Sequence, residues 1–194
     1  MIIEDTDLKF CADKVRQFTD GYHWSDGEKS RSIAELYWLA MNKEEKPILL
    51  RKFPMAANSH FVRSVYVERK NDFLIGLLDG LSQGDARFAQ CKELFQIVLR
   101  RPGTETGDIV DHIKNMILRS APESFDLNLG KPTVSESLAE IAASEWLYPY
   151  EHRVEHKKSG VRAAQIAVDY EIPRNVVEIY LTEPFMARLS GFFG

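Results

Sequence analysis

The stretch that decides the fold is Arg87-Phe88-Ala89-Gln90-Cys91-Lys92-Glu93-Leu94-Phe95-Gln96-Ile97-Val98-Leu99. Apolar residues recur in it at the three- and four-residue spacing of an amphipathic helix. They are Phe88, Cys91, Leu94, Phe95, Val98 and Leu99. The sequence therefore predicts a helix over 87–99 that buries one apolar face.

Lys92 and Gln96 are four residues apart, so they lie on one face of this helix, and Glu93 is next to Lys92. In zinc peptidases two His ligands have this spacing, and the Glu after the first His is the general base. This chain has Lys-Glu-Leu-Phe-Gln where that chemistry needs His-Glu-x-x-His. A zinc ligand must offer a lone pair, and an ammonium has none. We therefore expect no metal, no cofactor and no catalytic residue in this slot, which is formed by Lys92, Glu93 and Gln96.

Composition sets the broad class. With 194 residues, the chain can form one domain with a sizeable core, or a domain with a small helical appendage. The net charge of −4 provides no global positive field for nucleic acid or anionic lipid. Cys11 and Cys91 are too few for a disulfide framework, and we expect both to be buried on helices. No signal peptide or membrane-spanning stretch is recognisable, so we expect a cytoplasmic protein with no membrane partner.

Helical and strand patterns alternate along the chain in an order typical of an α+β fold with a short antiparallel sheet. The strands at 61–67 and 73–78 are expected to form a hairpin. Ser82 or Asp85 is the expected N-cap of the central helix. The full set of expected elements is helices at 4–18 and 30–43, strands at 48–50, 61–67 and 73–78, helices at 87–99, 107–119 and 133–148, and two short helices within 159–181.

Three elements follow one another in a recognisable order: the hairpin at 61–78, Arg87-Phe88 before the slot, and Ile141-Ala142-Ala143-Ser144-Glu145-Trp146-Leu147-Tyr148-Pro149 downstream. Their order and spacing resemble the ImmA/IrrE-type metallopeptidases, with a degenerate metal motif. The resemblance covers roughly residues 30–181. It implies a zincin-like domain over 1–158 and a helix-turn-helix-like tail over 159–194, packed on that domain.

The resemblance also implies a function. A family scaffold without its metal ligands is expected to be a non-catalytic pseudo-peptidase that binds a protein partner, in a regulatory setting linked to phage or other mobile elements. The family's third ligand is a carboxylate on the downstream helix, for which Glu136 and Glu140 are both candidates. The expected cleft residues are Lys92, Glu93, Gln96, Glu136 and Glu140. The Lys92 ammonium is expected either to replace the metal cation beside these carboxylates or to extend into solvent.

Two alternatives retain a peptidase. In the first, an active enzyme uses an unusual ligand set, such as Glu93 and Glu140 with His112, and cleaves a transcriptional repressor. In the second, His152-Arg153-Val154-Glu155-His156 matches the inverted zinc motif H-x-x-E-H. The charged surroundings of that segment favour an ordinary surface helix instead.

A further alternative is DNA binding by the tail. A helix starting near Pro173 would present Arg174 and Asn175 to the bases. Recognition also needs several cations for the phosphates, and Lys157, Lys158 and Arg162 supply few. A two-helix unit that completes the core explains the same pattern.

Overall fold

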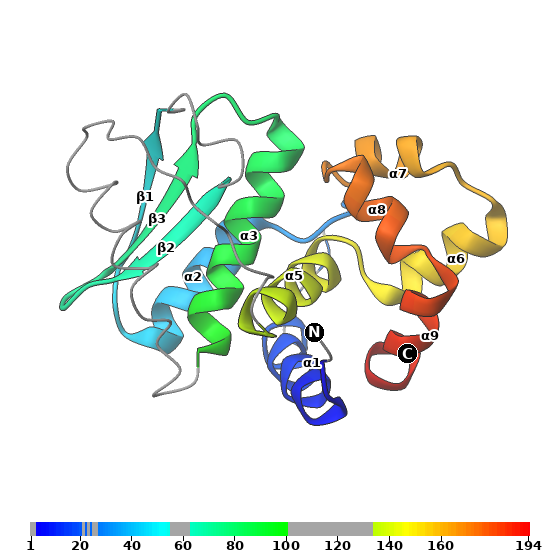
Figure 1. Cartoon of the computed structure of the whole chain (residues 1–194), viewed down its shortest axis with the longest axis horizontal. Coiled ribbons are helices and arrows are strands. Elements are labelled where there is room, and N and C mark those ends of the chain that lie inside the picture. Colours follow the sequence, from blue (N-terminus) through cyan, green and yellow to red (C-terminus); the bar gives the residue numbers. More distant parts are fainter. Residues whose placement is uncertain (1–2, 21, 23, 25–26, 55–62, 101–133) are drawn as a thin grey trace.

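The computed structural model describes residues 3–20, 22, 24, 27–54, 63–100 and 134–194. Eight helices and one three-stranded sheet in these residues confirm the α+β class (Figure 1). The expected helix at 107–119, and His112 within it, lie outside the described residues. The elements are α1 Asp5–Thr19, α2 Ile33–Glu44, β1 Ile48–Phe53, β2 Ser64–Glu68, β3 Phe73–Leu78, α3 Gln83–Leu99, α5 Val134–Leu147, α6 Tyr150–Ser159, α7 Ala163–Asp169, α8 Arg174–Tyr180 and α9 Glu183–Phe193. No helix among these residues is long and apolar enough to cross a membrane.

The sheet is mixed, so the prediction of an antiparallel sheet is wrong for one strand pair. β2 and β3 form the expected antiparallel hairpin, with Tyr66 opposite Ile75. β1 pairs in parallel with β3, with Ile48 beside Phe73, which gives the order β1-β3-β2. All of β3 is buried, whereas residues 49–52 of β1 are exposed. The strand that is apolar on both faces therefore takes the central position, and the more polar β1 forms an edge of the described sheet.

Helix α3 is longer than predicted and begins at Gln83. The Ser82 hydroxyl caps it by accepting a hydrogen bond from the backbone N–H of Asp85, at 3.1 Å. A serine cap satisfies one of the first backbone donors of a helix, which explains why the helix starts before its apolar face does. The capping prediction is thus confirmed for Ser82.

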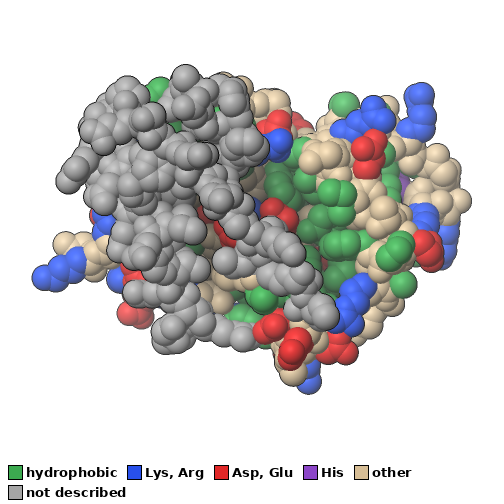
Figure 2. All heavy atoms as spheres, in the orientation of Figure 1, with side chains coloured by type: hydrophobic (Ala, Val, Ile, Leu, Met, Phe, Trp, Pro, Cys, Tyr) green, Lys and Arg blue, Asp and Glu red, His purple; other side chains and the backbone are tan. Residues whose placement is uncertain are grey.

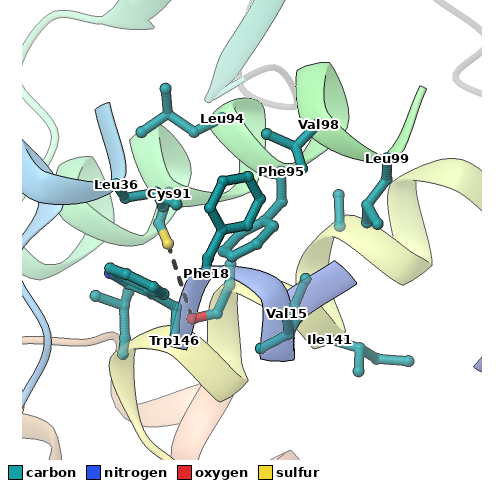
Figure 3. Close-up of a cluster of buried hydrophobic side chains, with 14 of the residues drawn as sticks. Val15, Phe18, Leu36, Cys91, Leu94, Phe95, Val98, Leu99, Ile141 and Trp146 are labelled. Atoms are coloured by element: carbon teal, nitrogen blue, oxygen red, sulfur yellow. Dashed lines mark hydrogen bonds between the residues drawn. The ribbon is translucent and has the colours of Figure 1, made fainter. Parts of the chain in front are cut away.

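The core extends along both sides of α3, which packs against α5 and α1 on one side and against the sheet on the other (Figure 1). The ring of Phe95 lies 6.4 Å from Phe18 and 6.3 Å from Trp146, both in edge-to-face contact (Figure 3). The Cys91 thiol lies 3.9 Å from the carbonyl oxygen of Ala143. Cys11 and Cys91 are both buried on helices, as predicted.

The tail contains the two short helices that the sequence predicts, α7 and α8, and adds α9, which it does not. Arg87 at the start of α3 joins this tail to the rest of the chain. Its guanidinium donates to the Tyr170 carbonyl at 2.7 Å, and to the Ser30 hydroxyl and the Arg31 carbonyl at 3.0 Å each. It also lies 3.4 Å from the Glu171 carboxylate. The division of the chain between residues 158 and 159 stays a prediction.

A buried ion pair connects α5 to α6. The Arg153 guanidinium is fully buried and donates to Glu145 Oε2 at 2.9 Å and to the Tyr148 carbonyl at 2.8 Å. The other carboxylate oxygen of Glu145 accepts from the Tyr150 backbone N–H at 2.9 Å. Burial raises the pKa of Glu145, against the attraction of Arg153. Each charge therefore depends on the other to remain in the interior.

Replacing Glu145 by Leu tests this pair. The substitution leaves the Arg153 charge buried without a counterion, so we expect the free energy of unfolding to fall by about 3–5 kcal/mol. Urea denaturation measures it. The double variant Glu145→Leu/Arg153→Leu is the control and should regain part of the loss, because no unpaired charge remains. A single substitution that costs less than about 1 kcal/mol would contradict the pairing.

Candidate functional site

The three slot residues lie on the enclosed C-terminal half of α3. Glu93 is 1% exposed and Gln96 is 8% exposed. The Lys92 side chain keeps 19% of its surface exposed, so it reaches the edge of the interior rather than open solvent. A glutamate is almost never buried this deeply without a partner. The geometry around Glu93 therefore decides what the slot can do.

Two groups meet one oxygen of Glu93. The Ser64 hydroxyl on β2 donates to Oε1 at 2.6 Å, and the Lys92 ammonium nitrogen lies 3.1 Å from the same atom. Oε2 is buried and has no hydrogen-bond partner among the described residues. The sequence did not reveal Ser64 as a partner of Glu93, although Ser64 lies in the predicted hairpin. The strand β2 begins at this residue. A strand serine gives no sign of which helix it faces.

The Lys92 ammonium is held by several carboxylates. Burial lowers the pKa of Lys92, but attraction and a hydrogen bond from Glu93, and then attraction from Glu140 and Glu136, raise it above the usual lysine value. Lys92 is therefore charged at neutral pH. Of the two expected arrangements, the structure shows the ammonium directed at Glu93, with α5 supplying further negative charge.

Glu136 and Glu140 on α5 both act on Lys92, so the structure does not separate the two candidates that the resemblance leaves open. Glu136 is half-buried and Glu140 is more exposed. Partial burial raises the pKa of Glu140, and the charges of Glu136 and Glu93 add to the rise, while Lys92 opposes it. One ammonium thus faces three carboxylates.

The slot residues do not fit a zinc ion. Lys92 as an ammonium has three donors and no acceptor, and Gln96 offers only a neutral amide oxygen. Glu93 already accepts from Ser64 and Lys92. Within the described residues, no group of three or more His, Cys, Asp or Glu side chains could hold a metal ion.

The inverted motif lies on α6, where both imidazoles face tyrosines. His152 Nδ1 is 3.0 Å from the Tyr170 hydroxyl, and His156 Nδ1 is 3.1 Å from the Tyr148 hydroxyl. The Tyr170 ring lies 5.9 Å from the His152 ring and 5.7 Å from the His156 ring. Burial lowers the pKa of His152, against the attraction of Glu155. The spacing of this motif is therefore explained by an aromatic cluster that packs α6 on the tail.

Arg174 and Asn175 are exposed on α8, as the DNA-binding alternative requires. However, the Arg174 guanidinium donates to Glu178 one turn later, at 2.7 Å. Figure 2 shows Lys and Arg side chains interspersed with Asp and Glu over the tail helices on that face of the molecule. This charge pattern is unlike the basic surface that phosphate contacts need.

Replacing Lys92 by Met tests the internal cation. The change leaves the Glu93 carboxylate buried without a positive partner, so we expect the free energy of unfolding to fall by about 3–5 kcal/mol. Lys9→Met on the exposed face of α1 is the matched control and should change stability by less than about 0.5 kcal/mol. Urea denaturation at pH 7 compares the two. Unchanged or increased stability in Lys92→Met would refute the pairing.

Replacing Glu140 by Gln tests how much the charged Glu140 carboxylate costs the folded state. The pKa of Glu140 is raised in the folded state, so the folded chain binds this proton more tightly than the unfolded chain does. The free energy of unfolding therefore rises as the pH falls towards about 4.3, the pKa of an unfolded glutamate. Glu140→Gln should therefore be more stable than wild type at pH 7. This advantage should vanish below about pH 4.3, where both side chains are neutral. Thermal unfolding across pH 4–8 measures it, and a variant less stable than wild type at pH 7 would contradict the proposed charge balance.

No family model matches the sequence, and no curated protein matches it. Among solved structures, a Mycobacterium tuberculosis transcriptional regulator is similar, with 12% sequence identity and a TM-score of 0.49. The match covers 89% of this chain and 47% of the regulator, so this chain spans about half the length of that protein. A similarity of this degree carries no conclusion about function.

Proposed function

We propose that this chain is a non-catalytic pseudo-peptidase of the ImmA/IrrE type, which binds a protein partner in a regulatory setting linked to phage or mobile elements. The order of elements supports this proposal. A hairpin precedes α3, α5 runs beside α3, and short helices follow. Glu136 and Glu140 on α5 lie close enough to act on Lys92 in the slot. The resemblance implies that the family's third ligand is a carboxylate on this helix.

The observation that carries the proposal is the ion pair between Lys92 and Glu93. In a metallopeptidase the slot glutamate takes a proton from metal-bound water. Here its Oε1 atom instead binds an ammonium and a serine hydroxyl. A general base that neutralises a fixed lysine has no activated water to deprotonate. The scaffold is then left with a surface for binding and no means of hydrolysis.

The alternatives have less support. An active peptidase that used Glu93 and Glu140 would have to bring a metal cation against the charged Lys92 ammonium, which lies 3.1 Å from Glu93. A metal ion bound to the Glu93 carboxylate would lie next to this ammonium, and neighbouring like charges repel strongly in a buried site. A DNA-binding regulator would need Arg174, which already pairs with Glu178.

Restoring the missing ligands tests the proposal. Lys92→His/Gln96→His places two imidazoles at i and i+4 on α3, opposite the carboxylates of α5. We expect this variant to bind about one zinc ion per chain and the wild type to bind none, because a zinc site needs three protein ligands with lone pairs. Elemental analysis after dialysis, and competition with a chelator, measure stoichiometry and affinity.

Lys9→His/Asp13→His is the matched control, since it places the same pair on the exposed face of α1 without a third ligand. We expect the slot variant to bind zinc at least about tenfold more tightly than this control. Equal affinity in the two variants would overturn the zincin-like interpretation of α3 and α5. Stoichiometric zinc in the wild type, together with peptidase activity, would establish the active-enzyme alternative instead.

A further inference from the structure

A second site lies at the other end of α3. An open groove of about 550 Å³ runs between residues 28–33, the first two turns of α3, and the turn that joins α7 to α8. This volume is within the usual range for ligand sites. The residues that matter here are Glu28, Ser30, Gln83, Arg87, Gln90 and Glu171.

The walls of the groove are fixed by close contacts. Arg87 ties them together through the Ser30 hydroxyl, the Arg31 carbonyl and the Tyr170 carbonyl. Gly84 lets α3 approach the turn, because a Cβ atom there would lie 3.2 Å from the backbone carbon of Ile172. The groove is therefore present in the folded chain and does not need a ligand to form.

The hydrogen-bonding groups left for a ligand are few and specific. Both terminal nitrogens of Arg87 already donate hydrogen bonds within the chain, and the Ser30 hydroxyl accepts one of these bonds. Gln83 and Gln90 line the groove, and their side-chain amides make no hydrogen bond among the described residues. They are seven residues apart on α3, so two helical turns, about 10.5 Å, separate them along one face. Each amide offers both a donor and an acceptor.

The charged residues of the groove favour a positively charged ligand. Glu28 and Glu171 bring two carboxylates, and Arg87 is the one cation among the described lining residues. The Glu171 carboxylate lies 3.4 Å from Arg87, but its side chain is 51% exposed, so its solvent-facing side can also meet a ligand. Anionic ligands such as phosphates would meet repulsion here and find no free cation. A ligand with a positive group and peptide-like amides matches the lining.

We propose that this groove binds an extended peptide segment carrying a Lys or Arg side chain, presented by the protein partner. The proposal rests on the partner-binding function proposed above and names the chemistry of the partner. An extended chain advances about 3.3 Å per residue, so the two glutamines span about three residues of peptide backbone. Their amides bind backbone N–H and C=O groups, and the basic side chain lies against Glu171.

The test titrates the ¹⁵N-labelled full chain with the peptide acetyl-Ala-Ala-Arg-Ala-Ala-amide. We expect saturable shifts of the Gln83 and Gln90 side-chain amide signals, and weaker binding at higher salt because exposed charges are screened. The same peptide with Glu in place of Arg should bind at least about tenfold more weakly. No saturable shift, or equal binding of the two peptides, would overturn the proposal.

Two variants assign the effect to the groove. Gln83→Ala/Gln90→Ala should weaken binding of the basic peptide by about tenfold. Gln165→Ala is the matched control, because Gln165 bonds Asp169 on α7 and does not line the groove; it should leave binding unchanged. Failure here is distinguishable from failure of the pseudo-peptidase proposal, which zinc binding by Lys92→His/Gln96→His tests without any peptide.

Discussion

The burial of the C-terminal half of α3 is the constraint on which the structure depends. Almost every side chain from Ala89 to Leu99 is enclosed between the sheet, α5 and α1. The apolar side chains are satisfied by packing, as Phe95 is by Phe18 and Trp146. Glu93 cannot be satisfied that way, because a carboxylate loses its water when it is buried. The Lys92 ammonium and the Ser64 hydroxyl supply what the solvent no longer does.

If the slot is a lost metal site, as we propose, its lysine is an incomplete substitute for a divalent metal. It brings one positive charge where zinc would bring two, and it offers donors where zinc accepts lone pairs. Two features of the slot are consistent with a shortage of positive charge. Glu93 Oε2 stays buried without a hydrogen-bond partner among the described residues. The pKa of Glu140 is raised, first by burial and then by the charges of Glu136 and Glu93, and Lys92 offsets this only in part. A site of this kind lowers the stability of the fold, which tolerates it.

The two ends of α3 have separate roles. Its C-terminal half contains the slot, and its N-terminal half holds the tail through Arg87 and forms one wall of the groove. Because one continuous helix joins them, the slot and the groove are kept at a constant spacing. A partner bound in the groove would therefore lie at a defined distance from the buried ion pair.

Local patterns were enough to predict much of this fold. The apolar spacing around Phe95 predicts α3, the alternation around Val65 predicts the hairpin, and Ser82 predicts a cap. Each of these signals is contained within a few neighbouring residues, because the periods of a helix and of a strand are short. The unusual lysine at position 92 was likewise visible in the sequence.

The remaining features depend on contacts between residues far apart in the chain, which no local pattern encodes. The parallel pairing of β1 with β3 was missed because strand order depends on which strand must be buried on both faces. Ser64, Arg87 and the tyrosines beside His152 and His156 were missed as partners because a polar side chain does not reveal what it will face. The sequence by itself determined the helices, the hairpin and the absence of metal ligands in the slot. Only the tertiary structure decided where the Lys92 charge goes, because burial of Glu93 against β2 and α5 creates the need for it.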